Sequence, residues 1–390
     1  MTSPTTARPE TPDELVANAR ALAPLLRAAA DEIDEARQLP PHIVSALRDA
    51  GCFRMSMPQT WGGCEADPLT QNRVIEAISA ASGSAGWCVM IAAANSYFTA
   101  FLDQEHAREM FPDVNAVIAA AFVPPARATV APGGYRVTGR LPFASGITHS
   151  AWVTAATHVH DASGELVLGP KGQAQRLLAM APIDEVEVLD TWRTGGLRGS
   201  GSNDFAFHDI FVPEEHTFSL DGPSKRPGAL YSLSSLFLTN HPGVPLGIGR
   251  GAIDDFVALI RDKPGRFGPP PREQPSIQAA LANAVVLVQS ARAFVFDALG
   301  ALWDALAAGC ETTTEQRVHV RLAIVHAHDA CARAVQQLYH AAGSASVYTP
   351  NALDRHFRDI HTADQHVIAS GGVYELGGKS LLTGLIPPLW

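Results

Sequence analysis

The spacing of apolar residues predicts a helical first part, a β part and a helical last part. Apolar side chains recur at helical spacing from a capping sequence that begins at Thr11 to about Arg37. Two prolines, Pro40 and Pro41, then interrupt the pattern. A short helix is predicted to end before Gly51, and three more follow at 68–82, 84–101 and 103–110. The first 110 residues therefore carry almost no strand signal.

The pattern changes after Pro112, where short runs rich in β-branched residues replace the helical spacing. Turns that contain glycine, proline or aspartate separate these runs, and Gly133-Gly134 is typical of a hairpin turn. Six or seven strands are predicted, from runs at 116–123, 135–138, 152–158, 165–168, 177–181, 186–189 and 205–212. Because no helices intervene, the pattern favours an antiparallel barrel or sandwich over a βαβ sheet.

Helical spacing returns near Gly247, after a linker predicted at Pro223–Arg226. The predicted helices are long, rich in alanine and apolar on more than one side, at 247–262, 275–309, 314–342 and 352–370. Helices of this kind pack into bundles and often against other subunits. We therefore predict an α+β chain with an N-terminal helical domain (1–114), a middle antiparallel β-barrel domain (115–220) and a C-terminal helical bundle (221–390).

The last predicted helix carries a stripe of polar residues between apolar faces. Arg355, Asp359, Thr362 and His366 follow one another at i, i+4, i+7 and i+11. One interpretation is a polar cavity within a helical core. The other is a surface ion pair beside a structural histidine, and spacing alone favours this second interpretation.

Composition narrows the function classes. The net charge is −10, and no run of Lys or Arg offsets it, which argues against a nucleic-acid surface. The five cysteines are scattered without a C-x-x-C pair, so we expect reduced thiols in a cytoplasm and predict no metal site.

Two segments bear on the membrane. The first 14 residues lack the apolar core of a signal peptide, and we interpret them as a disordered lead-in. The run at 83–102 is long enough to span a bilayer, but its Gly, Ser and Asn content favours a buried helix. We therefore expect a cytoplasmic protein with no membrane contact.

Four motifs stand out along the chain: LPFASG at 141–146, TWRTGGLRGSGS at 191–202 followed by NDFAFHDIFVP, RDKPGRFG at 261–268, and HAAGSA at 340–345. With the helical, β, helical order, they resemble the acyl-CoA dehydrogenase superfamily over essentially the whole chain. Within it, the details resemble the group D two-component flavin-dependent monooxygenases, which hydroxylate aromatic and indole-like compounds.

The resemblance implies that a flavin ring lies between the β domain and the bundle. The positions that match cofactor contacts are Phe122, Phe143, Ser145, Arg261, Arg266, Phe267, Gly343 and Ser344. On the residues alone, simpler interpretations stay open for three of them. Ser145 also suits a turn, Arg261 a basic helix C-terminus, and Gly343 a helix end.

The resemblance also implies the catalytic residues. His366 matches the histidine that the monooxygenases place over the flavin, and Ser145 is its predicted catalytic partner. The glutamate with which the dehydrogenases remove a substrate proton falls on Val367, so a thioester dehydrogenation has no base here. Trp87 and Asn95 are predicted to line the substrate site, with a core role as the alternative for Trp87.

The chain departs from the monooxygenase pattern at one place. Some of these hydroxylases carry a polar side chain near the flavin in the region that corresponds to Phe122–Pro125, which is apolar here. Hydrogen-bond donors to the reacting oxygen must then be backbone N–H groups, Ser145 and His366.

The implied reaction uses reduced FAD (FADH2) or FMNH2 and O2, through a C4a-hydroperoxyflavin, to hydroxylate a small phenol- or indole-like substrate. His366 is expected to accept a proton, because the pKa of an unperturbed imidazole is ~6.5. No nucleotide-binding βαβ unit is predicted, so a separate NAD(P)H-dependent flavin reductase has to supply the reduced flavin. The 261–268 match implies cofactor contacts across subunits, and we expect a homotetramer.

Three other functions remain open at this point. They are an acyl-CoA dehydrogenase or oxidase, an N-hydroxylase of amines on the same fold, and an inactive binding protein that keeps the fold.

Overall fold

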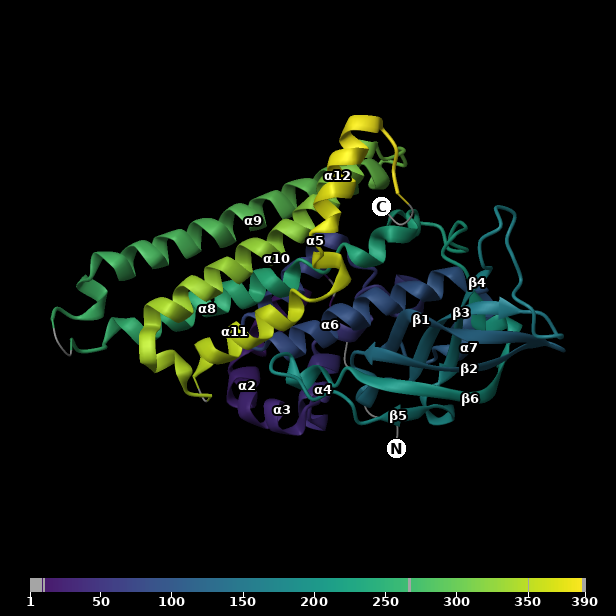
Figure 1. Cartoon of the computed structure of the whole chain (residues 1–390), viewed down its shortest axis with the longest axis horizontal. Helices are drawn as coiled ribbons and strands as arrows, with labels where there is room; N and C mark the ends of the chain where they lie inside the picture. The colour runs from purple at the N-terminus through teal and green to yellow at the C-terminus, as the bar shows by residue number, and fades with distance from the viewer. Residues whose placement is uncertain (1–8, 10, 266–267, 350, 388–390) are drawn as a thin grey trace.

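The chain is described by a computed structural model that covers residues 9, 11–265, 268–349 and 351–387. A helical bundle forms one end of the molecule and a β-sheet the other (Figure 1). The N-terminal helices are α1 (Pro12–Ala21), α2 (Ala23–Ala28), α3 (Ala30–Ala36), α4 (Pro41–Asp49), α5 (Pro68–Ser79), α6 (Gly83–Ser96) and α7 (Gln104–Met110).

The prediction of one continuous helix from Thr11 to about Arg37 is wrong, because the structure divides this segment into α1, α2 and α3. Pro24 stands in the first turn of α2, where its missing N–H and fixed φ suit a helix start. The same ring would break a helix that continued through it. A left-handed residue, Arg37, ends α3.

Helix α6 is the central element, between the bundle and the sheet (Figure 1). Nearly all of its residues are buried, and Ser82 caps it by accepting a hydrogen bond from the Ala85 N–H. Small residues allow its neighbours to approach closely: a Cβ on Gly86 would collide with Ser79 of α5. The apolar run at 83–102 is thus a core segment, made of α6 and a 3-10 turn at Tyr97–Phe101.

The strands form one sheet in the order β5-β6-β2-β1-β3-β4-β7. Their bounds are β1 (Ile118–Ala131), β2 (Gly134–Ala144), β3 (Trp152–His160), β4 (Arg176–Pro182), β5 (Glu187–Leu189), β6 (Asn203–Pro213) and β7 (Thr217–Phe218). The hairpin at Gly133-Gly134 joins β1 to β2 as predicted. The run predicted as a strand at 165–168 forms only isolated bridges.

One pair of strands differs from the antiparallel prediction, because β1 and β3 are parallel. Strand β2 runs back beside β1 and ends at the edge where β1 begins. A short connection there starts β3 on the far side of β1, so β3 runs in the same direction as β1 without a crossover helix. The sheet is therefore mixed, while the predicted helical, β, helical architecture is confirmed.

The C-terminal helices are α8 (Gly243–Arg261), α9 (Pro275–Ala307), α10 (Thr314–Ala342), α11 (Ala352–Ala363) and α12 (Gly372–Thr383). The helix predicted at 352–370 ends early, at Ala363. His366 has extended backbone (φ −67°, ψ 141°), and its side chain caps the 3-10 turn Val367–Ala369. This local bond replaces the continued helix, so His366 does not share a helical face with Asp359.

Helix α9 lies on the outside of the bundle, along α10 (Figure 1). Among the described residues it is the one helix long and apolar enough to cross a bilayer, and 22% of that stretch is buried. Its outer side exposes apolar residues such as Val285 and Val286. A helix with this composition also suits a bundle surface that another protein covers.

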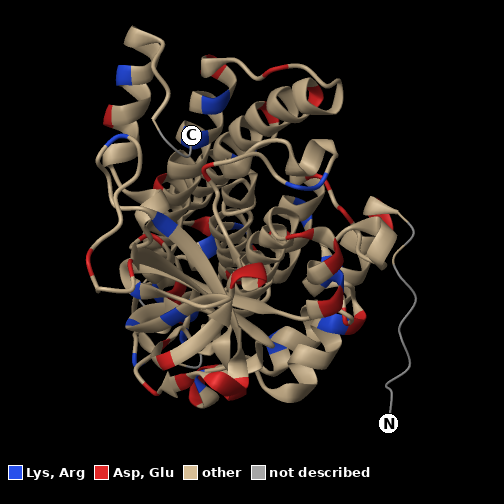
Figure 2. Ribbon diagram, turned by 90° about the vertical axis from the view of Figure 1, so that its right-hand side faces the viewer, with Lys and Arg blue, Asp and Glu red and all other residues tan. Residues whose placement is uncertain are grey.

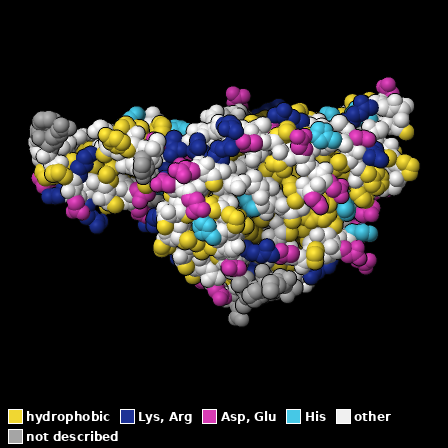
Figure 3. All heavy atoms as spheres, turned by 90° about the horizontal axis from the view of Figure 1, so that it is seen from below, with side chains coloured by type: hydrophobic (Ala, Val, Ile, Leu, Met, Phe, Trp, Pro, Cys, Tyr) yellow, Lys and Arg dark blue, Asp and Glu magenta, His cyan; other side chains and the backbone are white. Residues whose placement is uncertain are grey.

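Charged residues of both signs are mixed over the molecule. Figure 2 shows Lys and Arg interspersed with Asp and Glu around the sheet. The face seen from below in Figure 3 likewise mixes apolar, acidic and basic side chains. Neither view has the wide basic face that nucleic-acid binding needs.

His149, beside the end of β2, provides a test of this packing. Its ring is stacked on Phe53, with 5.8 Å between ring centroids, and both ring nitrogens are buried without a hydrogen-bond partner. Burial lowers the pKa of His149 to about 4. The unfolded chain, whose histidines titrate near ~6.5, binds a proton between these values that the folded chain does not. Stability is therefore lost as the pH falls from 6.5 to 4.

We predict that His149→Phe, which keeps the ring stacking, reduces this acid sensitivity. One proton corresponds to about 1.4 kcal/mol per pH unit in the slope of the unfolding free energy. Denaturant unfolding at several pH values between 6 and 4.5 measures that slope, with His42→Phe, at an exposed histidine, as the control. Equal slopes in the variant and the wild type would contradict the buried, unprotonated ring.

Candidate active site

Ser145 follows β2 at a point where that strand leaves its regular pairing with β6. Pairing reaches Leu141, which faces Phe205, and resumes at Ala144. In the irregular stretch between, Phe143 has a positive φ of 65° and is 68% exposed. The strand end thus presents an exposed aromatic ring and, two residues later, a hydroxyl group.

Strand β1 is irregular in the same region. Its ladder with β2 stops after the pair Arg127–Thr138. A continued register would place Phe122 opposite Phe143, but the two strands form no pairs there. Phe122 is 38% exposed and Val123 is 75% exposed. Apolar side chains are therefore open to solvent on both strands where their pairing ends.

Behind this surface, a hydrogen-bonded chain joins α6 to the β domain. The Trp87 indole N–H donates to Ser145 Oγ at 2.9 Å. Ser145 Oγ lies 2.8 Å from Ser202 Oγ, which lies 2.7 Å from Ser200 Oγ. All four side chains are buried, with Trp87 in the first half of the central helix. The serine-rich loop that the sequence singled out thus supplies hydroxyls directly behind Ser145.

His366 reaches the same indole from the bundle. Its ring centroid is 5.6 Å from that of Trp87, with the rings edge to face. Burial lowers the pKa of His366 to about 4, so the ring is neutral at pH 7. Its Nδ1 atom accepts a hydrogen bond from the Ile368 N–H at 3.3 Å. A neutral ring with Nδ1 as the acceptor carries its proton on Nε2.

Two further histidines lie next to His366. The ring of His241, just before α8, has its centroid 5.0 Å from that of His366. Burial lowers the pKa of His241 well below its usual value. His328, on α10, is fully buried, and burial with nearby His366 lowers its pKa to about 3. Its Nδ1 is 4.0 Å from the Asp364 carboxylate. The site wall is therefore lined by uncharged imidazoles.

Charged residues of α11 join the bundle to the β domain and to the N-terminal helices. Asp359 is buried and accepts a hydrogen bond from the Leu197 N–H of the β domain at 2.6 Å. Arg355 and Arg358 both reach Asp34 of α3. Burial raises the pKa of Asp359 to about 6. These contacts fix the end of α11, and therefore the position of His366.

The glycine-rich loop of the β domain is shaped for this contact. A Cβ on Gly196 would lie 2.0 Å from the Arg358 carbonyl oxygen, so a larger residue would push α11 away. Leu197, which donates to Asp359, has a left-handed backbone with φ 48°. The loop that contains the TWRTGGLRGSGS motif is thus bent so that it packs directly on α11.

The residues predicted to contact the cofactor's phosphates lie at the other end of the bundle. Arg261 ends α8, and Gly343 and Ser344 follow α10; all three are exposed. Lys263 Nζ donates to the Ala342 carbonyl at 3.1 Å, which holds the two ends together. Two other predicted contacts, Arg266 and Phe267, lie outside the described residues.

The two residues predicted to line the substrate site are both buried on α6. Trp87 faces the site through its contacts with Ser145 and His366. Asn95 donates from Nδ2 to the Ile118 carbonyl at 2.8 Å and so ties α6 to β1. A substrate contact of Asn95 stays a prediction.

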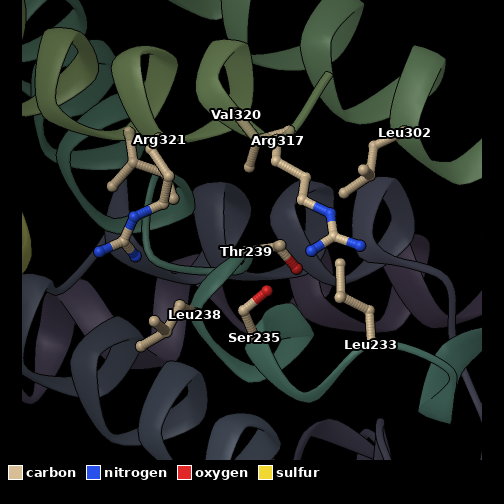
Figure 4. A pocket seen from close by; sticks show the side chains of 9 residues that line it. Leu233, Ser235, Leu238, Thr239, Leu302, Arg317, Val320 and Arg321 are labelled. Carbon is tan, nitrogen blue, oxygen red and sulfur yellow. The ribbon is translucent and has the colours of Figure 1, made fainter. Parts of the chain in front are cut away.

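A small cavity lies deeper in the bundle, where two arginines of α10 extend beside the turn before α8 (Figure 4). Its volume is about 10 Å³, which is room for one water and not for an aromatic ring. Burial lowers the pKa of Arg321 in its wall to about 10. The lining residues are Leu233, Ser235, Leu238, Thr239, Leu302, Arg317, Val320, Arg321 and Ile324.

The sequence did not point to four residues of the site: Ser200, Ser202, His241 and His328. The two serines belong to a motif that it did single out, and their alternation with glycine was the available signal. His241 and His328 have no local signal, because only the folded bundle brings them to His366. Among the described residues, no three His, Cys, Asp or Glu side chains are grouped to hold a metal.

The site fits a flat ring with a polar edge. Exposed Phe122, Val123 and Phe143 offer apolar contact, while the Ser145 hydroxyl and the His366 ring offer polar contact from two domains. A flavin ring has this combination of apolar faces and a hydrogen-bonding edge. The residues present therefore fit the cofactor that the motifs imply.

Comparison with known proteins identifies the family. Sequence models of the acyl-CoA dehydrogenase N-terminal domain and of the acyl-CoA dehydrogenase C-terminal domain match residues 10–115 and 241–371. Together the matches span more than half of the chain. The chain belongs to the acyl-CoA dehydrogenase superfamily. This confirms the resemblance drawn from the motifs and the fold class.

Similar members of the superfamily are flavin-dependent oxygenases. Indole-3-acetate monooxygenase from Acinetobacter baumannii is 28% identical over 358 residues, covering 90% of both chains. The oxygenase subunit HsaA of a flavin-dependent monooxygenase from Rhodococcus jostii is 26% identical over 89% of this chain and 92% of its own. The structure of XiaF from a Streptomyces species, in complex with FADH2 and glycerol, matches with a TM-score of 0.89 and 26% identity, covering 97% and 96% of the two chains.

The resemblance predicts that Val367 distinguishes this chain from the dehydrogenases of the superfamily. It occupies the position at which they are expected to carry the catalytic glutamate, and its side chain is 77% exposed beside His366. An apolar residue there cannot remove a substrate proton.

We predict that Asp359→Ala destabilises the protein by about 2 kcal/mol, because it leaves the buried Leu197 N–H without an acceptor. Asp359→Asn keeps an acceptor and should cost much less at pH 7. Because the pKa of Asp359 is raised, the contribution of this carboxyl group to stability falls as the pH rises from 4 to 6. The free energy of unfolding of the asparagine variant should therefore rise relative to that of the wild type over that range. Denaturant unfolding at pH 4.5 and 7 tests both statements. Equal losses in the two variants would contradict the docking role of the carboxylate.

Proposed function

We propose that this chain is the oxygenase component of a two-component flavin monooxygenase that hydroxylates a small phenol- or indole-like substrate. The observation that carries the proposal is the meeting of Ser145 and His366 on one indole, beside exposed apolar residues and with Val367 in place of a carboxylate. The oxygenases among its relatives support the same reaction class.

Bound reduced flavin, as FADH2 or FMNH2, supplies the electrons that activate O2 for insertion of one oxygen atom into the substrate. The residues of this chain hold and shield that chemistry. Ser145 donates to the polar edge of the ring, and the apolar side chains of β1 and β2 exclude water. His366 presents its Nε2–H to the space over the ring.

The role proposed for His366 differs from the proton acceptor expected from the sequence. An acceptor needs a free lone pair, but Nδ1 is already engaged by the Ile368 N–H and the pKa lies near 4. In the resting protein, His366 is therefore a hydrogen-bond donor toward the reacting oxygen or a substrate oxygen. A donor in a dry site stabilises negative charge that develops there.

A separate NAD(P)H-dependent flavin reductase completes the proposal. In the described chain the one parallel strand pair, β1 and β3, has no crossover helix. A dinucleotide fold needs such βαβ units. The chain thus has to receive flavin that another protein reduces, and the similarity to HsaA, an oxygenase subunit, supports this division.

Of the alternative functions, N-hydroxylation of an amine uses the same site and differs only in the substrate. Dehydrogenation of an acyl-CoA is disfavoured by Val367. No feature of the described residues favours an inactive scaffold, since the polar groups of the site are buried and linked by a continuous series of hydrogen bonds.

We propose a homotetramer in which each flavin contacts two subunits. Helix α8 has 19 residues and is about 28 Å long. Its C-terminal end, with Arg261, is therefore remote from its N-terminal end, where His241 contacts His366. A single flavin at Ser145 would meet Arg261 of a second copy more readily than its own. The exposed apolar sides of α9 and α12 support such contacts.

The proposed function predicts hydroxylation by the purified chain only when reduced flavin is supplied. Products from a panel of phenols and indoles, and peroxide release, are measured under O2 with chemically reduced FAD or FMN. His366→Ala should lower hydroxylation by about 10²–10³-fold, as expected for the loss of one preorganised hydrogen-bond donor, and change flavin binding far less. Val367→Glu should not create acyl-CoA dehydrogenase activity. NADH-driven turnover without a reductase would contradict the two-component assignment, and normal coupled turnover in His366→Ala would make the histidine structural.

The shared flavin site predicts complementation between two defective variants. Arg261→Ala and Ser145→Ala should each weaken flavin binding, by about tenfold for the charged contact. Mixed tetramers from co-expression should regain wild-type affinity at about a quarter of their sites, because random assembly joins an intact Ser145 to an intact Arg261. Arg250→Ala, at an exposed arginine of the same helix, is the matched control. No recovery in the mixture, or a flavin-binding monomer by light scattering, would contradict the proposal.

A further inference from the structure

We propose that Trp87 is a positioning residue for the flavin ring. Its indole N–H and the Ser202 hydroxyl together occupy both lone pairs of Ser145 Oγ and turn the Ser145 proton toward the bound ring. The inference rests on the proposed function for the identity of that ring. Its other part, the direction of the hydrogen bonds, follows from donor and acceptor counts.

The first step is the contact between Trp87 and Ser145. An indole N–H can only donate, so Ser145 Oγ is the acceptor across the 2.9 Å that separate them. A hydroxyl has two lone pairs and one proton. One lone pair of Ser145 is therefore engaged before any ligand arrives.

The second step is the direction of the serine chain. If the protons pointed inward, Ser145 would donate to Ser202, and Ser202 to Ser200. The Ser200 proton would then need an acceptor, but the described residues give Ser200 Oγ no hydrogen bond other than that to Ser202. Ser200 is 1% exposed, and a buried unsatisfied donor is costly.

In the outward direction the one proton without an acceptor in the protein is that of Ser145, and a bound ring can accept it. Ser200 donates to Ser202, and Ser202 donates to Ser145, across 2.7 and 2.8 Å. Both lone pairs of Ser145 are then filled, by Trp87 and Ser202. The one remaining proton belongs to Ser145, at the end of the chain that lies next to exposed Phe143. Ser145 is thus a donor that can no longer accept.

This direction has a consequence for the ligand. A hydroxyl that can only donate selects a ring position that accepts, such as a carbonyl oxygen, and disfavours an N–H. Reduced flavin carries both groups on the same edge, and its carbonyls become stronger acceptors as the ring gains charge. Trp87 thereby influences which ring atom Ser145 contacts, without itself touching the ring.

The indole itself is held rigidly. Its edge contacts to His366 and His241, with 5.6 and 6.1 Å between ring centroids, fix its plane. Trp87→Phe keeps an aromatic ring in this place and removes the N–H. It therefore separates the hydrogen bond from the packing.

A double-mutant cycle on reduced-flavin affinity tests the inference. Trp87→Phe should weaken binding by about 3- to 10-fold when Ser145 is present, as expected for one hydrogen bond. In the Ser145→Ala background the same substitution should change the affinity by less than about twofold, because the residue through which it acts is gone. An equal loss in both backgrounds would show that Trp87 acts by packing and would overturn the inference.

A matched control lies on the same helix. Ser96 is buried, and among the described residues its hydroxyl bonds only to the Ala93 carbonyl within α6. Ser96→Ala should therefore combine additively with Trp87→Phe. Coupling as large as that with Ser145 would mean a general loosening of α6, and would also overturn the inference.

A measurement without flavin separates this inference from the proposed function. In the ligand-free protein, hydrogen exchange of the Trp87 indole N–H, assigned by its loss in Trp87→Phe, should accelerate in Ser145→Ala. If Ser145→Ala leaves the exchange rate of the indole N–H unchanged, the inference is wrong, whereas the proposed function is unaffected. A wild-type chain that fails to bind reduced flavin would overturn the proposed function, and with it the orientation toward a flavin.

Discussion

The buried hydrogen bond from the Leu197 N–H to Asp359 is the contact on which the site depends. It joins the β domain to the bundle, and the salt bridges of Arg355 and Arg358 with Asp34 add the N-terminal domain. A buried carboxylate is costly, as its raised pKa indicates. The carboxylate of Asp359 lies where the bundle, the β domain and the N-terminal helices are in contact. The packing at this point positions His366 against Trp87.

The groups around the site are polar but uncharged. Burial keeps His366, His241 and His328 neutral, and the serine chain behind Ser145 carries no charge. A neutral wall suits an aromatic substrate and a flavin ring, because neither has to displace a counter-ion to enter. It also excludes the ions and water that would compete for a reactive oxygen species.

The order of domains could be predicted because apolar spacing is a local signal, and the buried nature of α6 followed from its small residues. The parallel pairing of β1 with β3 could not, since it depends on where the chain crosses after β2. His366 was identified by resemblance, but its helix was extended too far, because a local cap and tertiary contacts decide that α11 ends at Ala363. The approach of His241 and His328 to His366 needs the whole bundle, and no local pattern encodes it.

The early end of α11 has a consequence for how such proteins diversify. The charges that dock the helix lie before the break, whereas His366 and Val367 lie after it, where Ile368 is buried and Val367 is exposed. Exposed Val367 can therefore change without loosening the junction between domains. One scaffold can thus exchange a proton-abstracting carboxylate for a hydrogen-bonding imidazole in adjacent positions. The residues that dock the domains and the residue proposed to act in the reaction are thus separated by the three positions from Ala363 to His366.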